Sequence, residues 1–120
     1  MRILVLEKKP MVSLIPKMLS HHNYEADVEY TSDLSEALRW YSTRAPYDVV
    51  LAGLFGANGL PLAEHIRQHN PSQVVGIMTG FEGEELPAQI RELNIPVLRK
   101  PFSGDALIHF IESIKPHLSV

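Results

Sequence analysis

Four short segments follow apolar stretches of the chain, and they contain the residues that could do chemistry. They are Glu7-Lys8 after residues 3–6, Gly53 after 48–52, Thr79-Gly80 after 73–78, and Lys100-Pro101 after 95–98. Continuous apolar stretches of this length are typical of strands that are buried on both faces of a parallel sheet. The carboxyl ends of parallel strands meet at one edge, where such folds place ligands and reactions. We therefore expect these residues to line one pocket.

The reactive groups of this pocket are few. They are the carboxylate of Glu7, the ammonium groups of Lys8 and Lys100, and the hydroxyl of Thr79. Covalent catalysis needs an activated nucleophile, and a Mg²⁺ or Ca²⁺ site needs several oxygen ligands. A single carboxylate beside lysines satisfies neither requirement. We predict no catalytic residue, no metal site and no enzymatic activity.

Three glycines in the loop after the third apolar stretch allow a second interpretation. Gly53, Gly56 and Gly59 are three residues apart, and backbone N–H groups of such a loop can bind an anion at the start of a helix. A dinucleotide-binding loop, however, follows the first strand of its sheet. Turn flexibility is the favoured explanation. The alternative is a sensor of small molecules, anions or nucleotides that uses the loop from Gly53 to Gly59 and the space that the absent side chain of Gly53 leaves beside Lys8 and Lys100.

Strand and helix patterns alternate five times along the chain. Strands are expected at 3–6, 26–30, 48–52, 73–78 and 95–98, and helices between Pro10 and Asn23, from Ser32 or Asp33 to before Pro46, and at 60–69, 84–93 and 105–114. Pro16 predicts a kink in the first helix or a later start of it, and Ser103 is a predicted cap of the last helix. This alternation with short connections predicts a three-layer, doubly wound α/β sheet of five parallel strands.

The segment Val97-Leu98-Arg99-Lys100-Pro101-Phe102 resembles the end of strand five in the response-regulator receiver (CheY-like) family, whose lysine precedes a proline that is typically cis. Thr79-Gly80 resembles the family's Thr or Ser followed by a small residue, and residues 48–52 resemble the strand that leads to its phosphorylated aspartate. The resemblance extends over residues 1–120. It implies a single receiver-like domain with a flavodoxin-like sheet of strand order 2-1-3-4-5.

The departures from the family pattern concern its phosphorylation pocket. Gly53 stands where the resemblance places the phosphoacceptor aspartate, and Lys8 stands at the second acidic position. Mg²⁺ binding is expected to be lost, because an ammonium group repels the cation. Lys8 is expected to pair with Glu7 in place of the ion, and Lys100 is expected to turn toward Glu7. Val97 replaces an aromatic residue that acts as a switch in the family, so the resemblance implies a degenerate pseudo-receiver.

Composition and charge argue against two classes of partner, nucleic acids and membranes. The net charge of −3 with interspersed signs and the absence of a basic stripe argue against nucleic-acid binding. No stretch approaches the roughly 20 apolar residues of a membrane helix, and the absence of cysteine suits a reducing cytoplasm.

The resemblance then implies a phosphorylation-independent protein-interaction module of a two-component or phosphorelay-type signalling system. Its partner would be another signalling protein or regulator domain. We expect Glu92, Arg99 and Phe102 on the face formed by the fourth helix, fifth strand and fifth helix, through which family members dimerise or engage targets. A homodimer through this face is a further expectation.

Overall fold

Five parallel strands form one sheet in the computed structural model, which describes residues 1–54, 58–80 and 86–116. They are β1 (Arg2–Leu6), β2 (Asp27–Thr31), β3 (Val49–Gly53), β4 (Val75–Thr79) and β5 (Val97–Arg99). Their order across the sheet is β2-β1-β3-β4-β5, and every neighbouring pair is parallel. The strand order implied by the resemblance is therefore confirmed.

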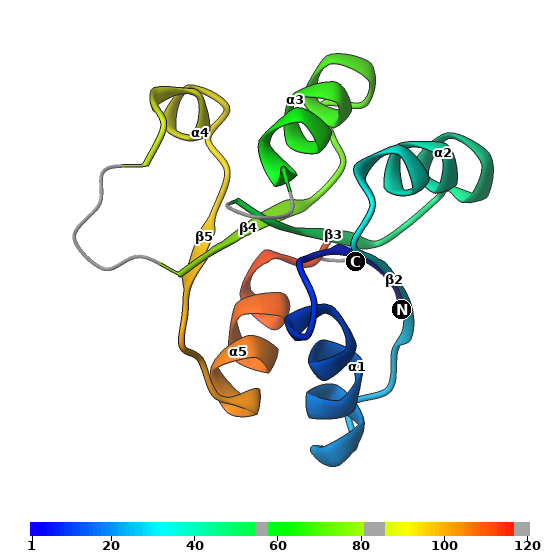
Figure 1. Ribbon diagram of the computed structural model, residues 1–120, viewed down its shortest axis with the longest axis vertical. Coiled ribbons are helices and arrows are strands. Elements are labelled where there is room, and N and C mark those ends of the chain that lie inside the picture. Colours follow the sequence, from blue (N-terminus) through cyan, green and yellow to red (C-terminus); the bar gives the residue numbers. More distant parts are fainter. Residues whose placement is uncertain (55–57, 81–85, 117–120) are drawn as a thin grey trace.

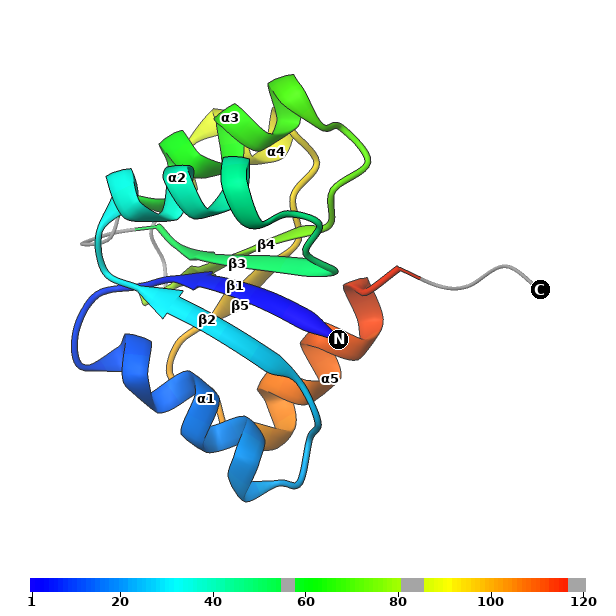
Figure 2. The same ribbon diagram turned by 90° about the vertical axis from the view of Figure 1, so that its right-hand side faces the viewer.

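Helices cover both faces of the sheet and give three layers, as predicted. α1 (Met11–His21) and α5 (Gly104–Ile114) lie on one face, and α2 (Leu34–Arg44), α3 (Gly59–His69) and α4 (Ala88–Glu92) lie on the other (Figures 1 and 2). Side chains of β1 alternate between the two cores, because Leu4 packs with the α2–α3 side and Ile3 and Val5 pack with the α1–α5 side. None of the described helices is long and apolar enough to cross a membrane.

The helix starts follow local side-chain chemistry. Asp33 caps α2 by accepting hydrogen bonds from the N–H groups of Ser35 and Glu36, and Ser103 caps α5 by accepting from Ala106 N–H. Of the two caps expected for α2, the structure therefore uses Asp33. α1 begins directly after Pro10 and runs past Pro16, so of the two alternatives predicted for Pro16 the later helix start is wrong.

The prediction for the fourth helix is also wrong in extent. The helix was expected at 84–93 with Pro87 inside it, whereas α4 spans only Ala88–Glu92 and Pro87 is its N-terminal cap residue. A proline suits the start of a helix because it has no N–H to donate, and it disfavours helical backbone in the residue before it. Residues 84 and 85 lie outside the described part of the chain.

Candidate functional site

The carboxyl ends of the strands bring the expected pocket residues to one edge of the sheet, which lies at the left of Figure 2. Glu7 follows β1, Gly53 ends β3, Thr79 ends β4, and Lys100 follows β5. The backbone N–H of Lys100 donates to the carbonyl oxygen of Thr79 at 2.6 Å, which fixes the end of β5 beside β4. The peptide bond between Lys100 and Pro101 is cis, as the resemblance implied. The grouping of these residues at one edge is therefore confirmed.

The carboxylate of Glu7 fills the space beside Gly53. Glu7 is 0% exposed, and a Cβ atom added to Gly53 would lie 2.3 Å from its Oε1 and 2.5 Å from its Oε2. Carbon and oxygen atoms that are not bonded do not approach so closely, so any side chain at position 53 would have to displace this carboxylate. The expectation of vacated space beside Gly53 is wrong, because a side chain from the neighbouring strand occupies it.

Lys100 compensates the buried charge of Glu7. Its Nζ lies 2.7 Å from Glu7 Oε2, and the Lys100 side chain is only 12% exposed. Oε2 accepts no well-aligned hydrogen bond within the described residues, so this contact is an ion pair held by proximity. Removing one member of such a pair leaves an uncompensated charge in a poorly hydrated place, which is far more costly than the net gain of the pair. The prediction that Lys100 turns toward Glu7 is confirmed.

Lys8 has a different role from the one expected. Its side chain is exposed and forms no ion pair with Glu7 in the described part of the chain; instead its backbone N–H donates to Glu7 Oε1 at 2.8 Å. The physical reason is that successive side chains of extended backbone point to opposite sides. Since Glu7 points inward, Lys8 points to solvent. The expected pairing of the Lys8 ammonium with Glu7 is therefore wrong, and Lys100 alone takes that role.

Thr79 and Val97 are the remaining residues of the predicted site, and neither side chain forms a hydrogen bond among the described residues. Thr79 is 1% exposed, and its Oγ1 has no hydrogen-bond partner among the described residues. Val97 is half-buried and packs against the core on the α2–α3 side of the sheet. At position 97 the chain therefore has a small aliphatic side chain fixed by packing.

The donors that the described residues place at this edge do not fit a Mg²⁺ cage. A hard divalent cation takes about six oxygen ligands. Glu7 already pairs with Lys100, and Gly53 has no side-chain donor. Across residues 1–54, 58–80 and 86–116, no three His, Cys, Asp or Glu side chains are grouped so as to hold a metal ion.

The glycine pattern after β3 has a packing explanation at one of its three positions. A Cβ atom added to Gly59 would lie 2.3 Å from the carbonyl oxygen of Gly53 and 2.9 Å from its carbonyl carbon. A glycine at the start of α3 thus lets the helix pack directly on the end of β3. Gly56 lies outside the described residues.

The expected partner residues lie near the β5 edge of the sheet. Glu92 at the end of α4 and Arg99 at the end of β5 are exposed. Phe102 is half-buried and packs against the core on the α1–α5 side. The first two residues therefore lie at the surface, whereas Phe102 contributes mainly to packing.

Comparisons with known proteins find matches among solved structures. No protein-family model matches the sequence, and no curated protein matches it. Solved structures do match: a receiver domain protein from Clostridium thermocellum has a TM-score of 0.80 at 22% identity, with 93% of this chain and 91% of that chain covered. The chain has the receiver-domain fold.

Two further receiver structures show the same fold. NtrX from Brucella abortus, solved in complex with ADP, has a TM-score of 0.78 at 23% identity; the match covers 93% of this chain but only 25% of that chain. The beryllofluoride-activated NtrC4 receiver domain, which is a dimer, has a TM-score of 0.75 at 21% identity, with 93% of each chain covered. The edge that holds Glu7, Gly53 and Lys100 is therefore the carboxyl edge of a receiver-type sheet.

Proposed function

We propose that this chain is a pseudo-receiver that works as a phosphorylation-independent protein-interaction module of a two-component or phosphorelay-type signalling system. The observation that carries the proposal is that the carboxylate of Glu7 fills the space that a side chain at Gly53 would need. Phosphoryl transfer to a receiver requires an accessible carboxylate nucleophile. Position 53 has none, and Glu7 is fully buried and paired with Lys100.

The pairing of Glu7 with Lys100 also supports the part of the proposal that the domain works without Mg²⁺. Among the described residues of this edge, the one carboxylate is that of Glu7, and an internal ammonium group 2.7 Å away neutralises it. A divalent cation would have to displace Lys100, and Glu7 would then be the one carboxylate to bind it among residues 1–54, 58–80 and 86–116, which is too few for a stable site. The proposed module is accordingly not an enzyme, and it needs no cofactor.

An internal ion pair also has a consequence for regulation. Glu7 and Lys100 connect the ends of β1 and β5 in the absence of any phosphoryl group. In the proposed function the surface near β5 therefore has one constitutive conformation. Val97 is consistent with this, because a small side chain packed against the core cannot act as a large rotating aromatic switch.

The partner proposed for this surface is another signalling protein or regulator domain in the cytoplasm. The face of α4, β5 and α5 presents Glu92 and Arg99 to solvent. The NtrC4 receiver domain shows that a domain of this fold can form a dimer. A homodimer through the same face is the corresponding proposal for this chain, and the molar mass in solution tests it.

Incubation with acetyl phosphate and Mg²⁺, followed by intact-mass spectrometry, tests the proposed function. We expect no mass increase of one phosphoryl group, while a receiver domain that is known to accept phosphate from this donor, treated in parallel, gains it. Amide chemical shifts should likewise not change when beryllofluoride and Mg²⁺ are added. A phosphorylated protein, or Mg²⁺-dependent shift changes at residues 7, 53 and 100, would contradict the proposal.

The alternative of a nucleotide or anion sensor is tested in the same samples. The structure gives it no specific support, because Glu7 fills the expected space and Gly59 is explained by packing. A ligand present at 100 times its dissociation constant adds about 2.7 kcal/mol of stability. Thermal unfolding with ADP, ATP and inorganic phosphate should therefore show no stabilisation if protein recognition is the function.

A further inference from the structure

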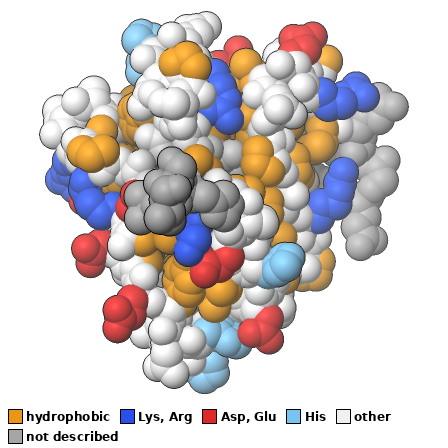
Figure 3. Space-filling model, turned by 180° about the vertical axis from the view of Figure 1, so that it is seen from behind, with side chains coloured by type: hydrophobic (Ala, Val, Ile, Leu, Met, Phe, Trp, Pro, Cys, Tyr) orange, Lys and Arg blue, Asp and Glu red, His pale blue; other side chains and the backbone are white. Residues whose placement is uncertain are grey.

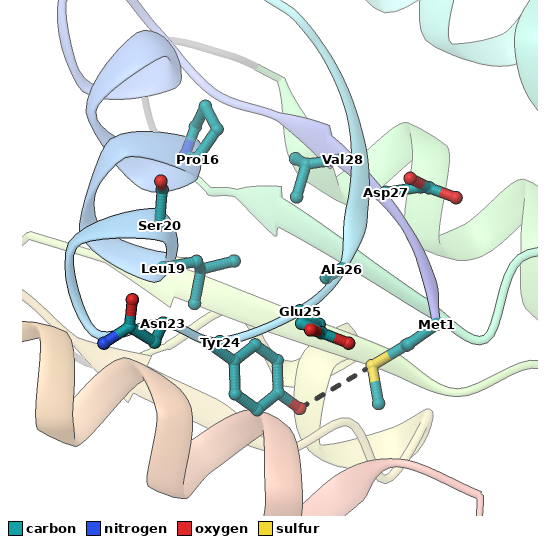
Figure 4. A pocket seen from close by; sticks show the side chains of 10 residues that line it. All are labelled: Met1, Pro16, Leu19, Ser20, Asn23, Tyr24, Glu25, Ala26, Asp27 and Val28. Carbon is teal, nitrogen blue, oxygen red and sulfur yellow. Dashed lines mark hydrogen bonds between the residues drawn. The ribbon is translucent and has the colours of Figure 1, made fainter.

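A groove lies between α1 and β2, near the amino ends of the strands and away from the Gly53 edge. Its volume is about 790 Å³. Pro16 and Leu19 of α1 form one wall, and Ala26 and Val28 of the β2 segment form the other (Figure 4). Ser20, Asn23, Glu25 and Asp27 also line it, so the groove combines apolar side chains on both walls with polar groups, and it lies against an edge of the sheet.

The strand beside this groove has one unpaired side. β2 is the edge strand of the sheet and pairs only with β1. Asp27 N–H donates to the Met1 carbonyl oxygen at 2.8 Å, and the Thr31 carbonyl oxygen accepts from Glu7 N–H at 3.2 Å. Since backbone groups of successive strand residues point in opposite directions, the N–H and C=O groups of Val28 and Tyr30 point away from β1. These two residues offer a second chain a short ladder of hydrogen bonds.

Side chains on the two sides of β2 differ in character. Val28 lines the groove, and Tyr30, two residues further along the strand, is 44% exposed. Asp27 also lines the groove, and its side chain extends from the opposite side of the strand to that of Val28 (Figure 4). A chain that pairs with β2 would meet Val28 on one side and the carboxylate of Asp27 on the other, because its own side chains alternate in the same way.

The electrostatic character of this corner is acidic. Residues 23–38 contain five acidic residues and no Lys or Arg: Glu25, Asp27, Glu29, Asp33 and Glu36. Glu29 and Glu36 form ion pairs with arginines, and Asp33 caps α2, whereas Glu25 and Asp27 are exposed and form no ion pair in the described structure. Seen from behind, the lower left of the molecule shows acidic side chains and no blue ones (Figure 3). Lys17, next to Pro16 on α1, is exposed, so it is the β2 side of this corner, with Glu25 and Asp27, that favours a cationic partner.

We propose that β2 and the α1–β2 groove bind an extended segment of a partner protein in which apolar and basic residues alternate. The segment adds to β2 through the outward backbone groups of Val28 and Tyr30. Its apolar side chains enter the groove between Pro16 and Val28, and its basic side chains lie near Asp27. Strand addition gives affinity through backbone hydrogen bonds and specificity through alternate side chains. An acidic segment would be repelled by the same carboxylates.

This surface is independent of the proposed function of the Gly53 edge, because the two lie at different ends of the sheet. Phosphorylation assays therefore do not test it, and each proposal can fail alone. The probe is a short capped peptide that alternates valine with lysine. The matched control peptide alternates valine with glutamate, and binding is followed by the amide chemical shifts of the full chain.

We expect saturable shifts of the amide signals of residues 16–31 with the lysine peptide and none with the glutamate peptide. Asp27→Lys should weaken binding about fivefold, because it replaces an attraction by a repulsion at the surface. Glu64→Lys, which changes the net charge equally on α3, should leave the affinity unchanged. These two variants separate a local ion pair from a general effect of net charge.

The backbone contribution is tested at Tyr30. Tyr30→Pro removes an N–H that β1 does not use, whereas Tyr30→Ala removes the side chain and retains the N–H. The proline variant should bind about threefold to tenfold more weakly than the alanine variant. Circular dichroism establishes that both are folded. The proposal is wrong if the lysine peptide does not bind, if its shifts lie at β5 or spread over the surface, or if the glutamate peptide binds equally well.

Discussion

Replacement of Gly53 by alanine gives the most direct test of the closed pocket. The added Cβ atom would lie 2.3 Å from Glu7 Oε1, and ordinary contacts begin at 3.4 Å, so the carboxylate would have to move by 1.1 Å. Such a movement disturbs both the 2.8 Å hydrogen bond from Lys8 N–H and the 2.7 Å contact with Lys100. Overpacking of this kind costs about 1–3 kcal/mol. Alanine recovers about 0.4–1 kcal/mol by restricting the unfolded chain, so we expect a net loss of about 1–2 kcal/mol.

Gly80→Ala is the matched control for this substitution. Gly80 follows β4 at the same edge, but its added Cβ atom would lie 3.7 Å from Lys100 Cδ, which is an ordinary contact. The free energy of unfolding should therefore change by no more than about 0.5 kcal/mol. Urea denaturation followed by the fluorescence of Trp40, the sole tryptophan, measures both variants.

A double-mutant cycle tests whether Glu7 causes the loss of stability in Gly53→Ala. In a Glu7→Ala background the carboxylate is absent, so Gly53→Ala should lose most of its cost, which corresponds to a coupling energy of about 1–2 kcal/mol. The reasoning is refuted if Gly53→Ala costs the same in both backgrounds. A cost of Gly80→Ala as large as that of Gly53→Ala would refute it as well, because the effect would then belong to the whole edge.

Three further predictions concern stability. Lys100→Met should destabilise the fold by about 3 kcal/mol in urea denaturation, because it leaves Glu7 buried without its cation. Gly59→Ala should cost about 2 kcal/mol in the same assay, because its Cβ atom would lie 2.3 Å from the backbone oxygen of Gly53; a neutral result would show that α3 can shift freely. Burial, followed by the hydrogen bond to Glu112, raises the pKa of Tyr24 from 10.0 to about 12. Between these values the unfolded chain has lost a proton that the folded chain retains, so the free energy of unfolding should fall as pH rises. Glu112→Gln should lower the pKa of Tyr24 in a spectrophotometric titration, and an unchanged value would contradict this assignment.

Local patterns in the chain predicted which segments form most of the strands and helices. The apolar stretches that end at Leu6, Ala52 and Met78 predicted buried strands, and β1, β3 and β4 lie there. Ser32 or Asp33 predicted the start of α2, where Asp33 is the cap, and Ser103 predicted the start of α5. Local sequence suffices here because a cap acts on the N–H groups of its own helix. The extent of α4 was mispredicted, because apolar spacing around Pro87 did not show on which side of the proline the helix lies.

The chain by itself determined which residues meet at the carboxyl edge, since a parallel sheet brings strand ends together whatever their side chains are. Only the tertiary structure decided how those residues are paired. Glu7 points inward and Lys8 outward, and Lys100 reaches Glu7 from β5, across strands that are far apart in the sequence. The absence of a side chain at Gly53 predicted an empty space. Because β3 pairs with β1, however, the side chain of Glu7 fills that space. Side-chain direction and packing between strands depend on the register of the sheet, and local sequence does not contain that register.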